Sequence, residues 1–292
     1  MKVLFAVFLL VACASATAPV ERAFGYHDRV AIPMARKIKE AEDNIHAMNR
    51  NARIVGGGAA SPNSHPYLGG LVITYVNRPN IGVCGSVLVS ASRLLTAAHC
   101  WDDGVVQAER FVVVLGSEFL FSGGFRIISY SVATYPGWDP VTQNNNLAVI
   151  ILKTPVLLTS NIQPIQLATN PNETFVGEWG VAAGYGFTSD AQSSVNVLSV
   201  IHEVTLQVIS VADCRSVFGN IAQPSTICTS GVGGVGTCRG DGGGPLRHRT
   251  TRHGNLNHIG ITAFGAASGC KSGLPSGYTR ITSFLDFINE SL

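Results

Sequence analysis

The feature that most constrains the fold is a series of short apolar segments separated by glycine, asparagine, serine or proline. Examples are residues 71–76, 83–89, 111–115, 147–152, 201–209 and 259–264. These segments are rich in β-branched and aromatic residues, which favour strands. No long helical patterns alternate with them, and this disfavours a parallel α/β fold. With 32 glycines available for turns, the sequence predicts an all-β fold.

Two regions near the ends depart from this pattern. Residues 17–53 are more charged, contain no cysteine and include helix formers at 35–42. The tail, residues 281–289, carries apolar residues at helical spacing (Ile281, Phe284, Leu285 and Ile288). The sharpest change in the character of the sequence falls between Arg53 and Ile54. A separate segment, residues 159–172, contains two prolines and is a plausible linker between two halves of the chain.

The extreme N-terminus has the pattern of a secretory signal peptide. Lys2 is followed by an apolar run, and Ala14-Ser15-Ala16 fits a cleavage site of small residues. We therefore predict a signal peptide over residues 1–16 and a secreted protein with no membrane anchor. A net charge of +2 is too mild to indicate binding to nucleic acid or to an anionic membrane.

The cysteines fit an oxidising compartment. Cys13 would leave with the signal peptide, and six cysteines remain: Cys84, Cys100, Cys214, Cys228, Cys238 and Cys270. They suggest three disulfides, but six cysteines allow fifteen pairings, so spacing alone does not decide between them. No paired C-x-x-C of a zinc ribbon occurs, and we expect neither a metal nor a cofactor. Glycosylation sequons begin at Asn172 and Asn289, and we expect the second to be unused because it lies so near the C-terminus.

Several motifs occur in one order along the chain. They are Arg53-Ile54-Val55-Gly56-Gly57, Thr96–Cys100, Leu147–Ile150 after an asparagine run, Gly240–Pro245, Ala263-Phe264-Gly265 and Pro275–Tyr278. Together they make residues 54–292 resemble the chymotrypsin-type serine proteases of peptidase family S1, in particular the insect digestive chymotrypsin group. The resemblance implies two antiparallel six-stranded β-barrels, about 54–165 and 166–292, with a C-terminal helix and a site between the barrels. It also implies the disulfides Cys84–Cys100, Cys214–Cys228 and Cys238–Cys270.

The resemblance implies a catalytic triad, and two of its three positions are changed. In that triad a serine attacks, a histidine takes the proton, and a buried aspartate fixes the histidine tautomer. His99 keeps its Ala-Ala-His-Cys setting, but Asn146 stands at the aspartate position and Gly242 at the serine position. An asparagine amide favours the wrong tautomer, which costs about 10⁴ in turnover. We expect Asp139 to be a loop residue and not a substitute, and a site serine of active relatives is replaced by Ala263.

The surroundings of the changed positions are kept. By resemblance, a trypsin-like protease would cut after Arg53, remove residues 17–53 as a propeptide, and free an ammonium at Ile54 that pairs with Asp241. Gly240 and Gly242 would supply the oxyanion-hole amides. The resemblance places Gly236, Gly265 and Ser276 along the specificity pocket, with Arg239 at its rim, where it would favour acidic residues in a bound peptide. No carboxylate is expected at the pocket base, so the expected guest is apolar or aromatic.

These observations predict a secreted, monomeric serine protease homologue without peptidase activity, and the resemblance to digestive enzymes extends the expected location to the gut lumen. It would bind peptides, protease inhibitors or a partner protease. The alternative is an active endopeptidase that uses Ser268 or Thr237 near His99, and a third reading is a structural or storage protein. The basic run 247–253 is expected to be a solvated hairpin loop, with a polyanion site as its alternative.

Overall fold

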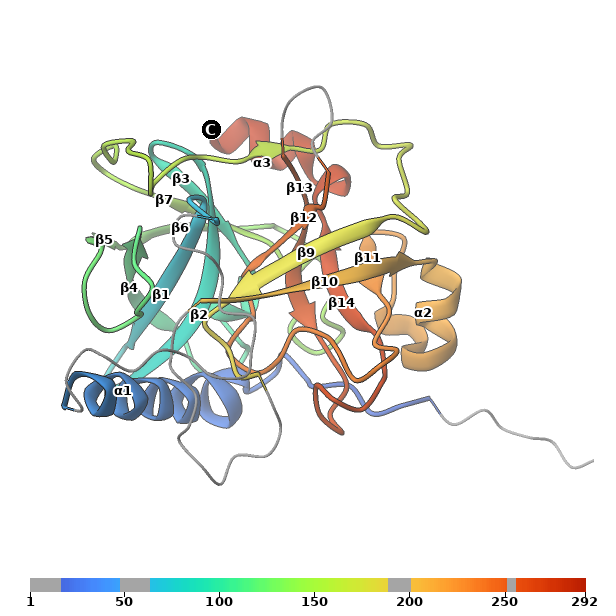
Figure 1. Cartoon of the computed structure of the whole chain (residues 1–292), viewed down its shortest axis with the longest axis horizontal. Coiled ribbons are helices and arrows are strands. Elements are labelled where there is room, and N and C mark those ends of the chain that lie inside the picture. Colours follow the sequence, from blue (N-terminus) through green and yellow to red (C-terminus); the bar gives the residue numbers. More distant parts are fainter. Residues whose placement is uncertain (1–16, 48–63, 189–200, 251–255) are drawn as a thin grey trace, which may run out of the picture.

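The computed structural model describes residues 17–47, 64–188, 201–250 and 256–292 (Figure 1). The predicted signal peptide and the Arg53–Ile54 junction lie outside the described residues. Two β-sheets hold most of the regular secondary structure of the described chain. The all-β prediction is confirmed, and the predicted strand segments fall within or largely overlap β1, β2, β4, β7, β10 and β13, whose bounds follow.

The first sheet is a barrel closed by one bent strand. Its strands are β1 Leu68–Tyr75, β2 Arg78–Ser90, β3 Arg93–Thr96, β4 Ala108–Leu115, β5 Phe125–Ser129, β6 Ser131–Thr134 and β7 Ala148–Ile151. They follow the order β5-β4-β1-β2-β3-β7-β6. Only Tyr130 separates β5 from β6, which occupy the two ends of this order, so residues 125–134 join the ends and close a six-stranded ring.

The second sheet closes directly. Its strands are β8 Gln166–Leu167, β9 Trp179–Gly184, β10 His202–Ile209, β11 Thr226–Thr229, β12 Pro245–His248, β13 Asn257–Phe264 and β14 Ser276–Arg280. The order is β12-β9-β10-β11-β14-β13-β8, and an additional β12–β13 pairing makes a ring of six strands with β8 outside it. The two antiparallel six-stranded barrels implied by the resemblance are therefore present, and β8, the one parallel neighbour of β13, falls in the expected linker.

Alternating side chains place the core inside each barrel. Along β10, Leu206 and Val208 are buried, whereas Glu203, Thr205 and Gln207 are exposed. Removing such an aliphatic side chain from water stabilises the fold by about 1.5–3 kcal/mol at most. Other strands, such as β1 and β14, are buried at nearly every position because both of their faces are covered.

Short helices cover the barrels. In α2, Val211–Phe218, Ser210 Oγ accepts a hydrogen bond from the Asp213 amide at 3.0 Å and caps the first turn. The predicted tail helix is present as the 3₁₀ turn Ile281–Ser283 followed by α3, Leu285–Ser291, with Ile281, Phe284 and Ile288 buried.

The N-terminal segment forms a longer helix. A π-helical turn, His27–Ala31, leads into α1, Ile32–Ala47, which contains the helix formers predicted at 35–42. Figure 1 shows α1 lying beneath the first barrel, where it packs against β2. Pro33 has no amide hydrogen to donate to the preceding turn, and the π-helical turn lies directly before it.

Covalent links and hydropathy complete the frame. The disulfides are Cys84–Cys100, Cys214–Cys228 and Cys238–Cys270, the pairing that the resemblance implied. Over the described ranges, no helix combines the length and apolar character needed to cross a bilayer.

Candidate active-site cleft

His99 is held rigidly at the junction of the barrels. It lies in the 3₁₀ turn Ala98–Cys100 directly after β3, and the disulfide from Cys100 to Cys84 ties this turn to β2. The ring is buried, and its Nδ1 lies 2.8 Å from Asn146 Nδ2. Burial lowers the pKa of His99 to about 3, so the ring is neutral at physiological pH.

Asn146 determines which nitrogen of that neutral ring carries the proton. Its Oδ1 accepts a hydrogen bond from the His99 backbone amide at 3.1 Å, and its own carbonyl accepts from Thr279 Oγ1 at 2.8 Å. With Oδ1 engaged, the Asn146 amide nitrogen must donate to Nδ1 of His99. The ring proton therefore sits on Nε2, which cannot accept a proton from a nucleophile.

Gly242 lies opposite that nitrogen. A Cβ added to Gly242 would lie 2.8 Å from His99 Nε2, so the serine position implied by the resemblance does face the histidine. Nε2 itself has no hydrogen-bond partner among the described residues. Gly240 and Gly243, on either side, have φ of +98° and +83°, a left-handed conformation that favours glycine.

No described hydroxyl replaces the missing nucleophile. The backbone amide of Thr237 donates to Ser276 Oγ at 3.2 Å, and Ser268 is exposed. Neither hydrogen-bonds the His99 ring. Asp139 is a loop residue whose carboxylate accepts from the Val141 amide and the Thr142 hydroxyl.

The loop between Cys238 and Gly242 keeps its polar framework. Asp241 accepts hydrogen bonds from the amides of Cys238, at 2.8 Å, and Gly186, at 2.9 Å. Burial nevertheless raises the pKa of Asp241 to about 6, and within the described part of the chain its carboxylate forms no ion pair. The amides of Gly240 and Gly242 donate to no backbone carbonyl of the described residues.

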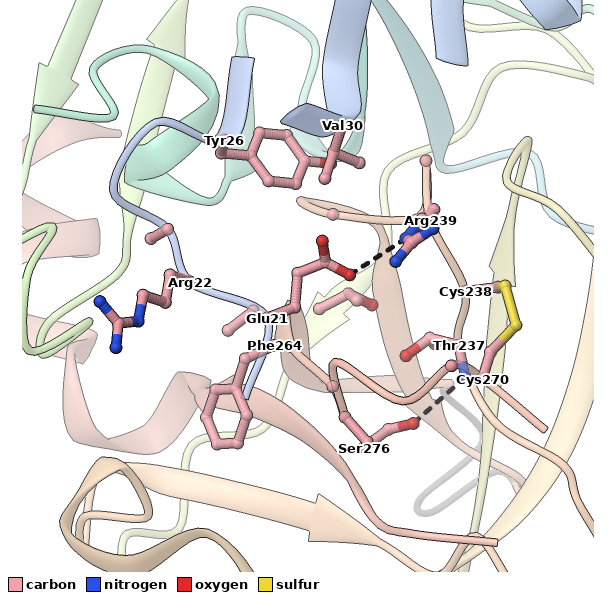
Figure 2. Close-up of a pocket in the computed structure, with 18 of the residues that line it drawn as sticks. Glu21, Arg22, Tyr26, Val30, Thr237, Cys238, Arg239, Phe264, Cys270 and Ser276 are labelled. Carbon is pink, nitrogen blue, oxygen red and sulfur yellow. Dashed lines mark hydrogen bonds and ion pairs between the residues drawn. A yellow bond between two sulfur atoms is a disulfide. The ribbon is translucent and has the colours of Figure 1, made fainter. Parts of the chain in front are cut away.

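The specificity pocket implied by the resemblance is only partly as expected. Arg239, Gly265 and Ser276 line the same cavity as His99 and Gly242 (Figure 2). Gly236 lies beside Ser276, where an added Cβ would be 2.8 Å from Ser276 Oγ, and it lines a neighbouring cavity.

The cavity is almost filled, and the N-terminal segment fills it. Its free volume is about 60 Å³, well below the roughly 300–1,000 Å³ of ligand pockets. The backbone amide of Glu21 donates to the Gly265 carbonyl at 2.9 Å, Val20 forms an antiparallel bridge with Ala266, and the Ala267 amide donates to the Pro19 carbonyl at 2.9 Å.

A carboxylate also enters the cavity. A Glu21 carboxylate oxygen lies 3.3 Å from Arg239 Nε (Figure 2), and its other carboxylate oxygen lies 4.0 Å from a guanidinium nitrogen of Arg29. Glu21 belongs to the N-terminal segment, outside the barrels, and it brings a carboxylate to the rim of the cavity beside Arg239.

Tyr26 occupies the reaction centre itself. Its ring centroid lies 4.3 Å from that of His99, with the ring planes tilted by 55°. Its hydroxyl would be 2.9 Å from a Cβ on Gly242, and it is buried without a partner among the described residues. Sequence reasoning missed Glu21 and Tyr26; the local sign is weak, an aromatic pair around a glycine (Phe24-Gly25-Tyr26) just before the helix formers.

Comparisons with known proteins agree with this geometry. The trypsin family profile matches residues 54–288. Brachyurin from Leptuca pugilator is 37% identical over 239 residues, which cover 80% of this chain and 96% of that protein. A collagenase from Hypoderma lineatum is 33% identical over 245 residues, covering 83% of this chain and 88% of the relative.

Solved structures show the same likeness in three dimensions. The structure of HL collagenase superposes with a TM-score of 0.70 at 31% identity, and the alignment covers 82% of this chain and 98% of that one. Profile, sequence and backbone coincide over the two barrels. The chain belongs to the trypsin family and carries a chymotrypsin-like serine protease domain.

Proposed function

We propose that this protein is a secreted pseudoprotease that binds peptides, protease inhibitors or a partner protease through its cleft without hydrolysing them. One observation carries the proposal: the His99 ring points its protonated Nε2 at Gly242, a residue with no side chain. The base is in the wrong tautomer, and the group that it should activate is missing.

The magnitudes favour binding over catalysis. Without a serine no acyl-enzyme can form, and what oxyanion amides and substrate binding alone provide in a related protease is on the order of 10³–10⁴ over water. Enzymes typically reach 10⁶ or more. The name of the Hypoderma lineatum relative, collagenase, indicates hydrolysis of a protein substrate. His99, Asn146 and Gly242 together do not supply the chemistry for such a reaction.

The proposal includes processing and location. The three disulfides fit an oxidising, extracellular compartment. A trypsin-like protease would cut between Arg53 and Ile54, and the new ammonium at Ile54 would pair with Asp241. Such a pair would lower the pKa of Asp241 from its raised value of about 6, because an adjacent positive charge favours the ionised carboxylate.

Activity assays on the cleaved protein test the proposal. We expect no turnover of chymotrypsin peptide substrates and no labelling by a serine-reactive phosphonate. The double variant Asn146→Asp with Gly242→Ser, freed of residues 17–53, should cleave measurably, and each single variant very little. Turnover or labelling of the natural sequence at the level of an active relative would overturn the proposal.

A binding assay separates the proposal from a structural or storage role. The cleaved protein is titrated with a protease inhibitor that docks through main-chain contacts, because such an inhibitor needs little from the missing serine. Saturable binding that competes with a cleft peptide supports the pseudoprotease. Failure to bind any inhibitor or peptide would favour a structural or storage protein.

A further inference from the structure

We propose that the N-terminal segment, residues 17–47, is a built-in ligand that keeps the cleft closed, and that an external peptide binds only by displacing its cleft end, residues 17–26, and presenting an acidic side chain to Arg239. This inference rests on the proposed function, because it assumes that the cleft binds peptides. Four features of the N-terminal segment support it, and each contributes a different part of the recognition.

The first feature is strand addition. Residues 19–21 pair in antiparallel fashion with residues 265–267 through the Glu21–Gly265 and Ala267–Pro19 backbone hydrogen bonds. Adding an extended strand to an open edge is a common mode of peptide recognition, in which main-chain bonds give affinity and side chains give specificity. An external peptide would need the same extended backbone and the same edge.

The second feature is the charge at the rim. Glu21 is 20% exposed, and Arg239 is 42% exposed. A pair this accessible to solvent contributes little binding energy, but it selects for the sign of the charge. The guanidinium of Arg29 also faces Glu21, and it would leave with the segment. Arg239 remains on the barrel and would then select an acidic side chain in the incoming peptide.

The third feature is the fit of Tyr26 to Gly242. The hydroxyl oxygen of Tyr26 and His99 Nε2 both lie within 3.0 Å of the position that a Cβ on Gly242 would take, and real Cβ atoms do not tolerate such contacts. The glycine that removes the nucleophile therefore also makes room for the N-terminal segment. A serine at this position would have to push Tyr26 or His99 aside.

The fourth feature is an anchor outside the cleft. In α1, Met34, Ala35 and Ile38 are buried against the barrel, and Met34 Cε would lie 3.0 Å from a Cβ on Gly240. These contacts all precede Arg53 in the chain. Cutting after Arg53 leaves every one of them intact, so cleavage alone does not empty the cleft; the segment must also dissociate.

Competition in the uncut protein strongly favours the internal segment. A tethered ligand acts at an effective concentration on the order of millimolar. An external peptide of equal intrinsic affinity at micromolar concentration would therefore occupy only a small fraction of the molecules. Weakening the segment should raise the affinity for an external peptide without altering the barrels.

The test uses the full chain and a fluorescein-labelled synthetic peptide of residues 17–31. The release variant combines Glu21→Gln with Tyr26→Ala. Its matched control combines Glu40→Gln with Phe24→Ala, which makes the same charge change and also removes an aromatic ring, at two exposed positions of the same segment. Fluorescence anisotropy measures peptide binding, and hydrogen exchange follows residues 18–26 and 262–268.

We expect the release variant to bind the peptide about 100-fold more tightly than the natural chain or the control, the effect of deleting a buried aromatic ring from the competing segment. Exchange at 18–26 should rise in the release variant only, while exchange in β1 and β10 stays unchanged and shows that the barrels are folded. A peptide with lysine in place of Glu21 should bind about tenfold more weakly, and Arg239→Glu in the release variant should restore its binding.

Two results would overturn the inference: equal peptide affinity in the natural chain and the release variant, or equally fast exchange at residues 18–26 in both. Failure of Arg239→Glu to restore binding of the lysine peptide would overturn the acidic selectivity. A release variant whose segment exchanges freely but which binds neither peptide nor protease inhibitor would contradict the proposed function instead, because the cleft would then be open and still not bind.

Discussion

The two ends of the N-terminal segment are attached to the barrels in different ways. The cleft end, residues 17–26, is held by a few backbone bonds, a solvent-accessible ion pair and a ring that buries an unpartnered hydroxyl. The helix end, residues 27–47, buries an apolar face, and its Glu42 carboxylate accepts hydrogen bonds from the amides of Leu120, at 2.6 Å, and Phe121, at 2.9 and 3.0 Å.

The helix end therefore anchors the segment to the barrel, and the cleft end closes the cleft. The buried apolar face and the Glu42 hydrogen bonds make the helix end costly to detach, since removing it would expose apolar surface and leave donors unpaired, although His27 Nε2 is buried without a partner among the described residues. Docking of the cleft end is stabilised less, because the buried Tyr26 hydroxyl and His99 Nε2 both lack partners among the described residues. The cleft end should therefore open first while α1 stays docked.

The largest expected effect is at the helix end. Glu42→Ala would leave the buried Leu120 and Phe121 amides without their acceptor and should weaken docking of the segment by about 3–5 kcal/mol. Hydrogen exchange across residues 32–45 measures the loss. The control is Glu40→Ala, at an exposed position of the same helix. An equal effect of the two variants would show that the Glu42 hydrogen bonds do not anchor the segment.

A single methyl group should loosen the cleft end. Gly242→Ala introduces a Cβ at 2.8 Å from His99 Nε2 and 2.9 Å from the Tyr26 hydroxyl oxygen, and overpacking of this kind costs about 1–3 kcal/mol. Gly265→Ala in the same cavity meets nothing within 4 Å. Exchange at residues 18–26 should rise for the first variant only; a rise for both would show that any bulk in the cleft has this effect.

Acid should weaken docking through His27. Burial lowers its pKa to about 3 in the docked segment, and the ring faces Tyr75, Asp28 and Arg78, with Asp103 bound to its backbone amide. A released His27 titrates near 6.5, so the released form takes up protons first and docking is lost as pH falls below that value. Affinity should drop about tenfold by pH 5.5.

The pH effect is measured between pH 7.5 and 5.5 with the labelled peptide of residues 17–31 and protein freed of residues 17–53, whose own His27 no longer occupies the site. A peptide with glutamine in place of His27 should lose much less affinity over the same range. Identical pH profiles for the two peptides would assign the effect to another group, with the buried His99 as the first candidate.

The smallest expected effect has the opposite sign. Tyr26→Phe removes a buried hydroxyl that has no partner among the described residues, and it should leave docking unchanged or strengthen it by up to about 1 kcal/mol. Exchange at residues 18–26 reports the change. A loss of more than that amount would mean that the hydroxyl is hydrogen-bonded in solution, and the cleft end would then be better satisfied than the structure indicates.

Much of the frame was predictable because it depends on local patterns. β-Branched and aromatic runs bounded by turn residues marked the strands, helical spacing marked the tail, and the family resemblance carried by the motif order indicated the two barrels and their disulfides. The positions of Asn146 and Gly242 also followed from motif order. Closure of the first barrel was not predicted from the sequence. It depends on a bend at Tyr130 that joins β5 and β6, the two strands at opposite ends of the sheet order.

The sequence by itself determined what the reaction centre lacks: a glycine has no nucleophile in any conformation, and an asparagine cannot act as a carboxylate. Only the tertiary structure decided what fills the centre instead. Glu21 and Tyr26 meet Arg239, Gly265 and Gly242 across more than two hundred residues of chain, and contacts at such separation leave no local periodicity in the sequence. They form because both barrels and α1 must fold before the N-terminal segment has a surface to bind.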